Sequence, residues 1–408
     1  MKKAIVSIFC LGMILSIFPQ QVQEESFVIN IEVPVRVFSG DRFVDHLTIN
    51  DFEVFEDGVR QSVDAVYLVK KRSIERSEEK KRFSPDTARN FYLFFEISDY
   101  TGKLGNAIRH FVENVLDPGD LLTIVTPVKT YRLRGKALEV KSREEVTREL
   151  KGLLRKDALT GNSEYRNVIQ DLSSLAQSLA AAISQDETLR IRTDLSSGEQ
   201  REGESVGEKL TRYEELLGRL EQLREVNQKK LLDFAEYLQD KDGQKYVYLF
   251  YQREFVPQIE SRILDQYINQ YQDNPNIQQT ISNVFEFFRR DVTFDIETVK
   301  QAYANASIAI HFLFISTPIQ KMYGIQFQER SEDIFSAFDQ MAAATGGFIE
   351  SSANPESLFQ KALESSENYY LLYYTPRNYR GDGSFRNIRV KVKQGGYRLT
   401  HRVGYFAN

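Results

Sequence analysis

The chain carries at residues 91–102 the stretch Phe91-Tyr92-Leu93-Phe94-Phe95-Glu96-Ile97-Ser98-Asp99-Tyr100-Thr101-Gly102. Its first seven residues are apolar apart from Glu96, a composition that predicts a strand buried on both faces of a parallel sheet. Ser98, Asp99 and Tyr100 follow where this strand should end. Ligands of open α/β sheets bind at the carboxyl ends of the strands, so this junction is the first candidate for a functional site.

Further apolar runs predict more strands of the same sheet, at residues 121–128, 245–251, 308–315, 347–350 and 369–374. Apolar residues at helical spacing lie between them, as at residues 104–116 and 335–345. The first of these helices should end at Asp117-Pro118-Gly119-Asp120 and the second at Gly346-Gly347, because glycine accepts the left-handed backbone of a helix end. This alternation predicts an α/β fold with helices on both faces of a parallel sheet.

Two long insertions interrupt the pattern, at residues 142–240 and 259–291. Ser142 and Glu145 have the spacing of a capping box, which predicts that a helix begins there. Residues 208–239 carry one apolar stripe and are predicted as a single helix. The heptad spacing of this stripe breaks near residues 224–230, which favours packing within the chain over a coiled-coil dimer.

Alternating apolar and polar residues at both ends of the chain predict a small β module. Its N-terminal strands span residues 27–69 and contain an Asp57-Gly58 turn. The charged residues 70–88 are predicted as a linker to the main α/β domain, residues 89–376. Residues 384–408 predict a C-terminal hairpin. Each part alone would expose an apolar face, so we expect the hairpin to pack on the N-terminal strands.

Composition limits the classes of function. A chain of 408 residues with 41% hydrophobic residues is able to bury a large core. With 53 basic and 58 acidic residues its net charge is −5, which argues against nucleic-acid binding, because that function depends on a basic surface. Cys10 is the single cysteine, so disulfides are excluded; a mature chain that lacks Cys10 would also have no thiolate metal site and no cysteine nucleophile.

The N-terminus has the three parts of a secretion signal. Met1-Lys2-Lys3 supplies charge, residues 4–18 form an apolar run, and Pro19-Gln20-Gln21 is a polar exit. We therefore predict a signal peptide at residues 1–20 and a mature protein in the periplasm or outside the cell. The run is shorter than the ~20 residues that span a bilayer, and no other membrane span is expected. The cleavage position, and retention of the segment as an anchor, are open.

Several motifs together resemble the von Willebrand factor A-related proteins of the acidobacterial type. The match runs from about residue 28 to the end and omits the two insertions. Its pieces are Leu47-Thr48-Ile49-Asn50-Asp51-Phe52-Glu53-Val54-Phe55-Glu56-Asp57-Gly58, Leu116-Asp117-Pro118-Gly119-Asp120, Ala342-Ala343-Ala344-Thr345-Gly346-Gly347-Phe348, Tyr369-Tyr370-Leu371-Leu372-Tyr373-Tyr374-Thr375-Pro376, Phe385-Arg386-Asn387-Ile388-Arg389-Val390 and Arg402-Val403-Gly404-Tyr405-Phe406. Their order and spacing carry the resemblance.

The resemblance implies a Rossmann-like sandwich that binds proteins, often through a divalent metal. In that family the loop after the first strand reads Asp-x-Ser-x-Ser, a second loop adds a Thr hydroxyl and a third adds an Asp. This chain has Glu96, Ser98 and Tyr100 in the first loop, Thr160 or Ser163 for the second, and Gln252-Arg253-Glu254 for the third. Mg²⁺ demands near-ideal octahedral oxygen ligands, so we predict that the adhesion site is degenerate and that no metal or other cofactor binds.

Catalytic motifs are missing from the sequence. His46, His110, His311 and His401 are scattered without metal-ligand spacing, and there is no Gly-x-Ser-x-Gly elbow or phosphate-binding glycine loop. We therefore expect a non-enzymatic, exported protein-binding module, an adhesion or scaffold protein of the cell envelope. Its expected partner-binding rim comprises Glu96, Ser98, Asp99, Tyr100, Ser163, Tyr251, Gln252, Arg253 and Glu254.

Two alternatives to this prediction remain. One is a metal-dependent adhesion domain with a variant site made of Glu96, Ser98, Asp99 and Glu254. The other is an envelope hydrolase with an unrecognised site. Neither the partner's identity nor the oligomeric state follows from the sequence.

Overall fold

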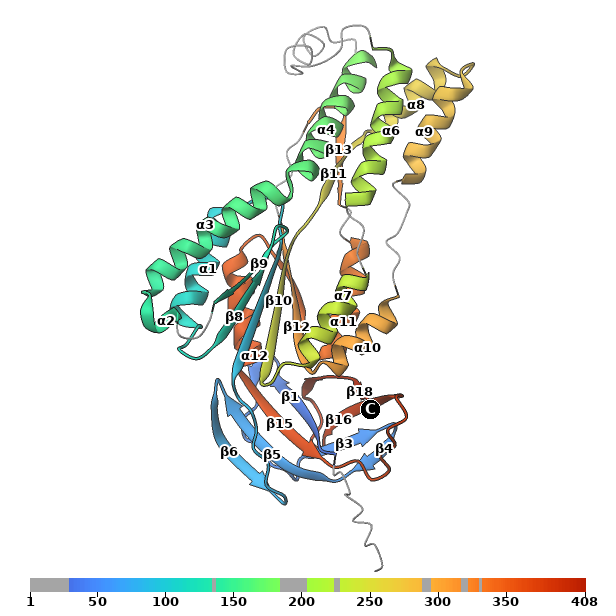
Figure 1. Cartoon of the computed structure of the whole chain (residues 1–408). Coiled ribbons are helices and arrows are strands. Elements are labelled where there is room, and N and C mark those ends of the chain that lie inside the picture. The colour runs from blue at the N-terminus through green and yellow to red at the C-terminus, as the bar shows by residue number, and fades with distance from the viewer. Residues whose placement is uncertain are drawn as a thin grey trace, which may run out of the picture.

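The larger part of the molecule is built on one six-stranded sheet (Figure 1). The computed structural model describes residues 29–133, 137–183, 204–223, 228–287, 295–316, 322–329 and 332–408, and the chain is mixed α/β. The strand order is β14 (Ile349–Ser352), β12 (Ile308–Ile315), β10 (Gln244–Gln252), β7 (Arg89–Glu96), β8 (Leu121–Val125) and β9 (Thr130–Leu133). All neighbours are parallel except β9, which runs antiparallel to β8.

The central strand β7 shows why these residues form a buried strand. Phe91, Leu93 and Phe95 face one core, and Tyr92 and Phe94 face the other. The first core is covered by α1 (Gly102–Asn114), α3 (Arg143–Gly161) and α12 (Pro355–Glu367), and the second by α7 (Gln228–Gln239), α10 (Ile296–Asn305) and α11 (Glu332–Thr345). Burial on both faces removes the usual alternation of apolar and polar residues. The five strands predicted between residues 91 and 350 are confirmed in this sheet.

A β module of two further sheets lies below the central sheet in Figure 1. One sheet has the order β17 (Arg398–His401), β1 (Ile31–Ser39), β15 (Asn368–Tyr374), β5 (Val63–Lys70) and β6 (Ser73–Glu79), with β2 (Arg42–Phe43) paired to β1. The other has the order β18 (Gly404–Phe406), β16 (Phe385–Val392), β3 (Phe52–Glu56) and β4 (Val59–Gln61). Since β17 pairs with β1 and β16 with β3, the two chain ends share one module.

The strand predicted at residues 369–374 belongs to this β module, and its assignment to the parallel sheet was wrong. It forms β15, antiparallel between β1 and β5. Tyr370 and Leu372 face the core between the two small sheets, and Tyr369 and Leu371 face a separate cluster. A strand buried on both faces has the same composition in either sheet, so the apolar run could not distinguish them.

Two other parts of the β module differ from the prediction. Residues 70–88 were predicted as a linker, but they contain β6, which pairs with β5. The residues of β6 are mostly exposed, as expected of an edge strand, and this explains their polar composition. Residues 384–408 do not form one hairpin, because β16 pairs with β3 and β18 while β17 pairs with β1.

The two insertions come together in a second body, which we call the helical module. It consists of α4 (Ser163–Ile183), α6 (Val206–Leu223), α8 (Ser261–Gln270), α9 (Pro275–Phe287) and the two-stranded ribbon of β11 (Phe255–Ile259) and β13 (Ile325–Glu329). These elements share a core of their own, at the top of Figure 1. The single helix predicted at residues 208–239 is divided between two cores, because α6 packs in the helical module and α7 packs on the central sheet.

The capping box predicted at Ser142 and Glu145 is present, and it opens α3. The short helix α2 (Ala137–Val140) comes before it. The predicted signal peptide lies outside the described residues. Among the residues that are described, no helix is both long and apolar enough to cross a bilayer.

Candidate functional site

The candidate site lies where the winding of the central sheet reverses. From β7 the chain proceeds through β8 to β9, and it then returns to the other side of β7 with β10, β12 and β14. The loops after β7 and β10 therefore leave the sheet in opposite directions, and such a switch point is where open α/β sheets bind ligands. Ser98, Asp99 and Tyr100 follow β7, and Arg253 and Glu254 follow β10.

The side chain of Gln252 links the end of β10 to the loop after β7 by hydrogen bonds. Its side chain is buried at the end of β10, and its Oε1 accepts from the backbone N–H of Ser98 and of Asp99, both at 2.9 Å. The Ser98 hydroxyl donates to the same oxygen at 3.2 Å. Three donors of the first loop therefore converge on one neutral amide oxygen. The arrangement joins β7 to β10 without a charged group.

Arg253 points away from this loop, toward the helical module. Its Nη1 contacts both carboxylate oxygens of Glu329 at 2.9 Å, on the ribbon strand β13. Its guanidinium carbon lies 6.0 Å from the centre of the Phe335 ring, and its backbone N–H donates to the Ile315 carbonyl. Arg253 therefore joins the sheet to the base of the helical module.

Tyr251 and Tyr100 are also packed into the structure. The Tyr251 ring lies 5.6 Å from that of Phe314 and 6.4 Å from that of Phe338, on the face covered by α11. Tyr100 packs against the opposite core, and its hydroxyl lies so close to Gly105 of α1 that a β-carbon there would overlap it. Burial raises the pKa of Tyr100, an effect that Arg155 partly offsets.

Thr160 and Ser163 are exposed and bonded locally. The Thr160 hydroxyl donates to the Lys156 carbonyl at 2.9 Å, and the Ser163 hydroxyl donates to the Thr160 carbonyl at 3.0 Å. The structure does not bring either hydroxyl into the hydrogen bonds around Gln252.

Asn162 is the residue of this loop that the sequence analysis missed. Its Nδ2 donates to the Ile97 carbonyl at 2.7 Å and so connects the end of α3 to the end of β7. A side chain at the preceding Gly161 would overlap Pro127, so the end of α3 lies close to the turn between β8 and β9. The consecutive helix-ending residues Gly161 and Asn162 were the available signal.

The exposed surface of the site is acidic and partly apolar. Asp99 is exposed, and Glu254 is half-buried. Glu96 is exposed as a whole residue, but burial of its carboxyl group raises its pKa, an effect that Lys230 offsets in part and that Glu254 adds to. Leu159 and Val128, near the close contact at Gly161, are 44% and 46% exposed. In the described parts of the chain, no three His, Cys, Asp or Glu side chains gather as they would around a metal ion. Carboxylates beside apolar side chains are able to bind a basic or amphipathic protein surface.

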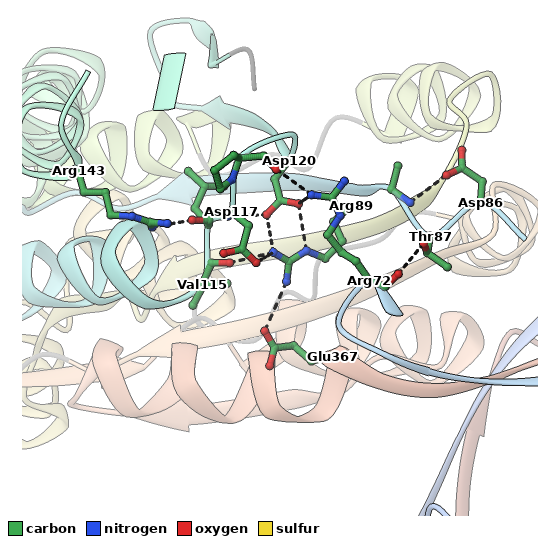
Figure 2. A network of polar contacts seen from close by, with 12 residues as sticks. Arg72, Asp86, Thr87, Arg89, Val115, Asp117, Asp120, Arg143 and Glu367 are labelled. Carbon is green, nitrogen blue, oxygen red and sulfur yellow. Dashed lines mark hydrogen bonds and ion pairs between the residues drawn. The ribbon is translucent and has the colours of Figure 1, made fainter. Parts of the chain in front are cut away.

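The opposite, amino edge of the sheet holds a network of buried ion pairs, which Figure 2 shows. Arg89, at the start of β7 and 1% exposed, donates to both carboxylate oxygens of Asp120 and to Asp117. Asp120 also accepts from the Asp117 backbone N–H at 2.8 Å. Arg143 donates to the carbonyls of Val112 and Glu113 at the end of α1, and to that of Leu116 just after the helix at 2.6 Å. The Asp117-Pro118-Gly119-Asp120 motif is therefore a structural turn that pairs a buried arginine.

Comparison with known proteins does not identify a family. The chain matches no family model and no curated protein. Among solved structures, it is similar to the human COPII-coat protein Sec24c, with a TM-score of 0.24 and 7% sequence identity. That similarity covers 85% of this chain and 46% of Sec24c, so the chain spans less than half of that protein's length. A TM-score this low supports no inference about fold or function.

Proposed function

We propose that the chain is an exported, non-enzymatic protein-binding module, an adhesion or scaffold protein that binds its partner without metal. We propose also that its main domain is a von Willebrand factor A-type, Rossmann-like sandwich. The strand order supports the fold. Counted from β7 in chain order, the central sheet reads 3-2-1-4-5-6, the order of doubly wound sheets whose ligands bind at the switch point. Export rests on the N-terminal sequence pattern alone.

The hydrogen bonds of Gln252 carry the proposal that metal is not used. The family resemblance leads us to expect an Asp at this end of β10, where this chain has Gln252. The amide oxygen already accepts from Ser98 and Asp99, so the first loop is held by protein groups. A neutral amide supplies no charge to a divalent cation, whereas such sites depend on carboxylates.

The partner surface that we propose is the exposed rim around Asp99. Tyr100, Tyr251 and Arg253 are engaged in packing or in an ion pair, so they support the rim and do not present themselves to a partner. The exposed groups are the Asp99 carboxylate and the side chain of Leu159. We therefore expect a partner that presents a basic or amphipathic segment.

Site-specific crosslinking tests this proposal. A photoreactive residue at position 99 should capture a protein from the envelope fraction, and the same residue at Arg389, exposed on the β module, should not. Asp99→Lys should weaken capture at a second rim position such as Glu96, because it reverses the charge offered to a basic partner. Chelator should leave capture unchanged.

The same capture assay and a separate turnover assay distinguish the alternatives. Capture that chelator abolishes and Mg²⁺ restores would contradict the metal-free proposal and support the variant metal site. Turnover of peptides or glycans that is lost in Asp99→Asn would instead identify a hydrolase. Equal capture from positions 99 and 389 would reject the rim as the partner surface.

A further inference from the structure

A cleft of about 400 Å³, which we call the interface cleft, lies where the β module meets the amino edge of the central sheet. Its walls come from the start of β1, the end of β15, residues 83–86 before β7 and residues 242–244 at the start of β10. Figure 1 shows β1 and β15 beside the base of β10 in this region. The volume lies within the range of small-molecule sites, which often form between two bodies of a protein.

The side chains that line the interface cleft are mostly hydrogen-bond acceptors. Those with a side-chain oxygen, apart from a tyrosine, are Asn30, Glu32, Ser84, Asp86, Asp242 and Gln244. Among the described residues, neither lysine nor arginine belongs to the lining. Phe83 and Tyr373, whose ring centres are 4.4 Å apart, supply its apolar part. A ligand that fits this lining therefore brings N–H or O–H donors of its own.

Two carboxylates of the lining, Asp86 and Asp242, are not paired with a cation. Both residues are exposed, and neither forms an ion pair within the described chain. Asp86 accepts from the Ala88 backbone N–H at 2.9 Å. Asp242 acts on Lys245 only through its charge, from a distance. Most acceptor positions of the two carboxylates are therefore open to a ligand.

Gln244 is the buried member of the lining that lacks a donor. It is 8% exposed, and its Nε2 donates to the Glu32 carboxylate at 3.1 Å. The other oxygen of that carboxylate accepts from the Tyr373 hydroxyl. The Gln244 Oε1 receives no hydrogen bond from any described residue. Polar atoms of buried side chains normally have a partner, so this oxygen points to a donor on a ligand.

The basic side chains near the interface cleft have acceptors of their own. Lys81 donates to an amide oxygen of the lining at 3.0 Å. Lys245 and Arg402, both buried, donate to backbone carbonyls. The charge of Glu32 acts on both of these buried cations, so it is already offset. The charges that remain to attract a ligand are those of the two exposed aspartates.

The placement of these acceptors favours an organic cation over a metal ion. A divalent metal needs its oxygen ligands within about 2.6 Å of one point. In the part of the chain that the structure describes, no three Asp, Glu, His or Cys side chains gather in that way. A guanidinium group carries five N–H donors in a planar fork and binds carboxylates through paired hydrogen bonds. It suits acceptors that are spread along a cleft, and the alkyl chain attached to it suits the Phe83 and Tyr373 rings.

We propose that the interface cleft binds a guanidinium group, with Asp86 and Asp242 as its charged acceptors and the Gln244 Oε1 as its buried acceptor. The group belongs either to a free guanidino compound or to an arginine side chain of a peptide. The interface cleft and Asp99 lie at opposite edges of the central sheet, so the proposal does not depend on the proposed partner surface.

Isothermal titration calorimetry of the full chain with two probes tests the proposal. Arginine amide represents a free compound, and acetyl-Gly-Arg-Gly amide represents a peptide. Both should bind, and citrulline amide, whose neutral urea has nearly the same shape, should bind at least about tenfold more weakly, because its hydrogen bonds are not charge-assisted. Tighter binding of the peptide would identify a peptide source, and equal binding a free compound. Equal affinity for citrulline amide, or no binding of either probe, would overturn the proposal.

One matched pair of variants locates the binding. Asp242→Asn should weaken the binding of arginine amide about tenfold, because it removes a charged acceptor. Asp240→Asn, the same change at an exposed residue outside the lining, should leave binding unchanged. Equal weakening in both variants would show that long-range charge alone attracts the probe and would overturn the assignment.

A second measurement uses the wild-type protein alone and so does not depend on the folding of a variant. Crystals soaked in arginine amide should show the guanidinium within hydrogen-bond distance of Asp242 and of the Gln244 Oε1. Density for the probe only at other surfaces would contradict the proposal.

Discussion

The two edges of the central sheet use polar residues in opposite ways. At the amino edge, Arg89 is fully buried and paired with Asp120 and Asp117. At the carboxyl edge, the buried connection is the neutral amide of Gln252, and the Asp99 carboxylate is exposed. The difference indicates that charge at the amino edge stabilises the fold, whereas charge at the carboxyl edge is the feature on which the proposed partner surface rests.

The largest effect is expected from breaking the buried ion pair at the amino edge. Asp120→Ala leaves Arg89 buried with its weaker contacts to Asp117 and Glu367, and removing one partner of such a pair costs about 3 kcal/mol of unfolding free energy. Urea denaturation followed by circular dichroism measures the change. Asp99→Ala is the matched control at the carboxyl edge, and as a surface substitution it should change stability by less than about 0.5 kcal/mol. Similar losses in both variants would remove the distinction between the edges.

A smaller loss of stability is expected when the Gln252 hydrogen bonds at the carboxyl edge are removed. Gln252→Ala removes the acceptor of the Ser98 and Asp99 backbone N–H groups, so the unfolding free energy should fall by about 1–3 kcal/mol. Hydrogen exchange at these two amides should become faster. Gln326→Ala, an exposed glutamine on β13, serves as the control and should leave exchange unchanged. Unaltered exchange in Gln252→Ala would show that the loop is held by other contacts.

Substitution of Tyr100 tests whether its side chain supports the rim from within or contacts the partner directly. Tyr100→Ala removes a partly buried ring from the core beside α1, and we expect a loss of about 1–2 kcal/mol, less than for a fully buried aromatic residue. Crosslinking through position 99, normalised to folded protein, should be preserved. Tyr323→Ala, at a ring that is 47% exposed, should alter stability much less. Loss of capture without loss of stability would make Tyr100 a contact residue after all.

The smallest effect concerns the link between the sheet and the helical module. The Arg253–Glu329 pair is partly exposed, with side chains 23% and 19% accessible, so solvent screens it. A double-mutant cycle with Arg253→Ala and Glu329→Ala should give a coupling free energy of about 0.5–1 kcal/mol. Thermal unfolding of the four proteins measures it. A coupling comparable to the loss in Asp120→Ala would mean that the carboxyl edge also depends on an ion pair for its stability.

Much of the local structure could be predicted from the sequence. The apolar run before Ser98 became β7, Ser142 and Glu145 formed their capping box, and Asp57-Gly58 formed a turn with positive φ at both residues. These features depend on neighbours along the chain and on how many faces of an element are buried. The order and spacing of residues are enough to predict both the local contacts and the number of buried faces.

The contacts between residues that are distant in the sequence could be learned only from the tertiary structure. The tyrosine-rich strand β15 is apolar enough for either sheet, and the amide of Gln252 gave no sign that Ser98 and Asp99 would donate to it. Likewise Glu32 and Tyr373, which lie 341 positions apart in the numbering, line one cleft with Asp242. Periodicity records that a face is buried but not what buries it. Which residues meet is decided when non-local segments pack together, and the site and the interface cleft are both products of that packing.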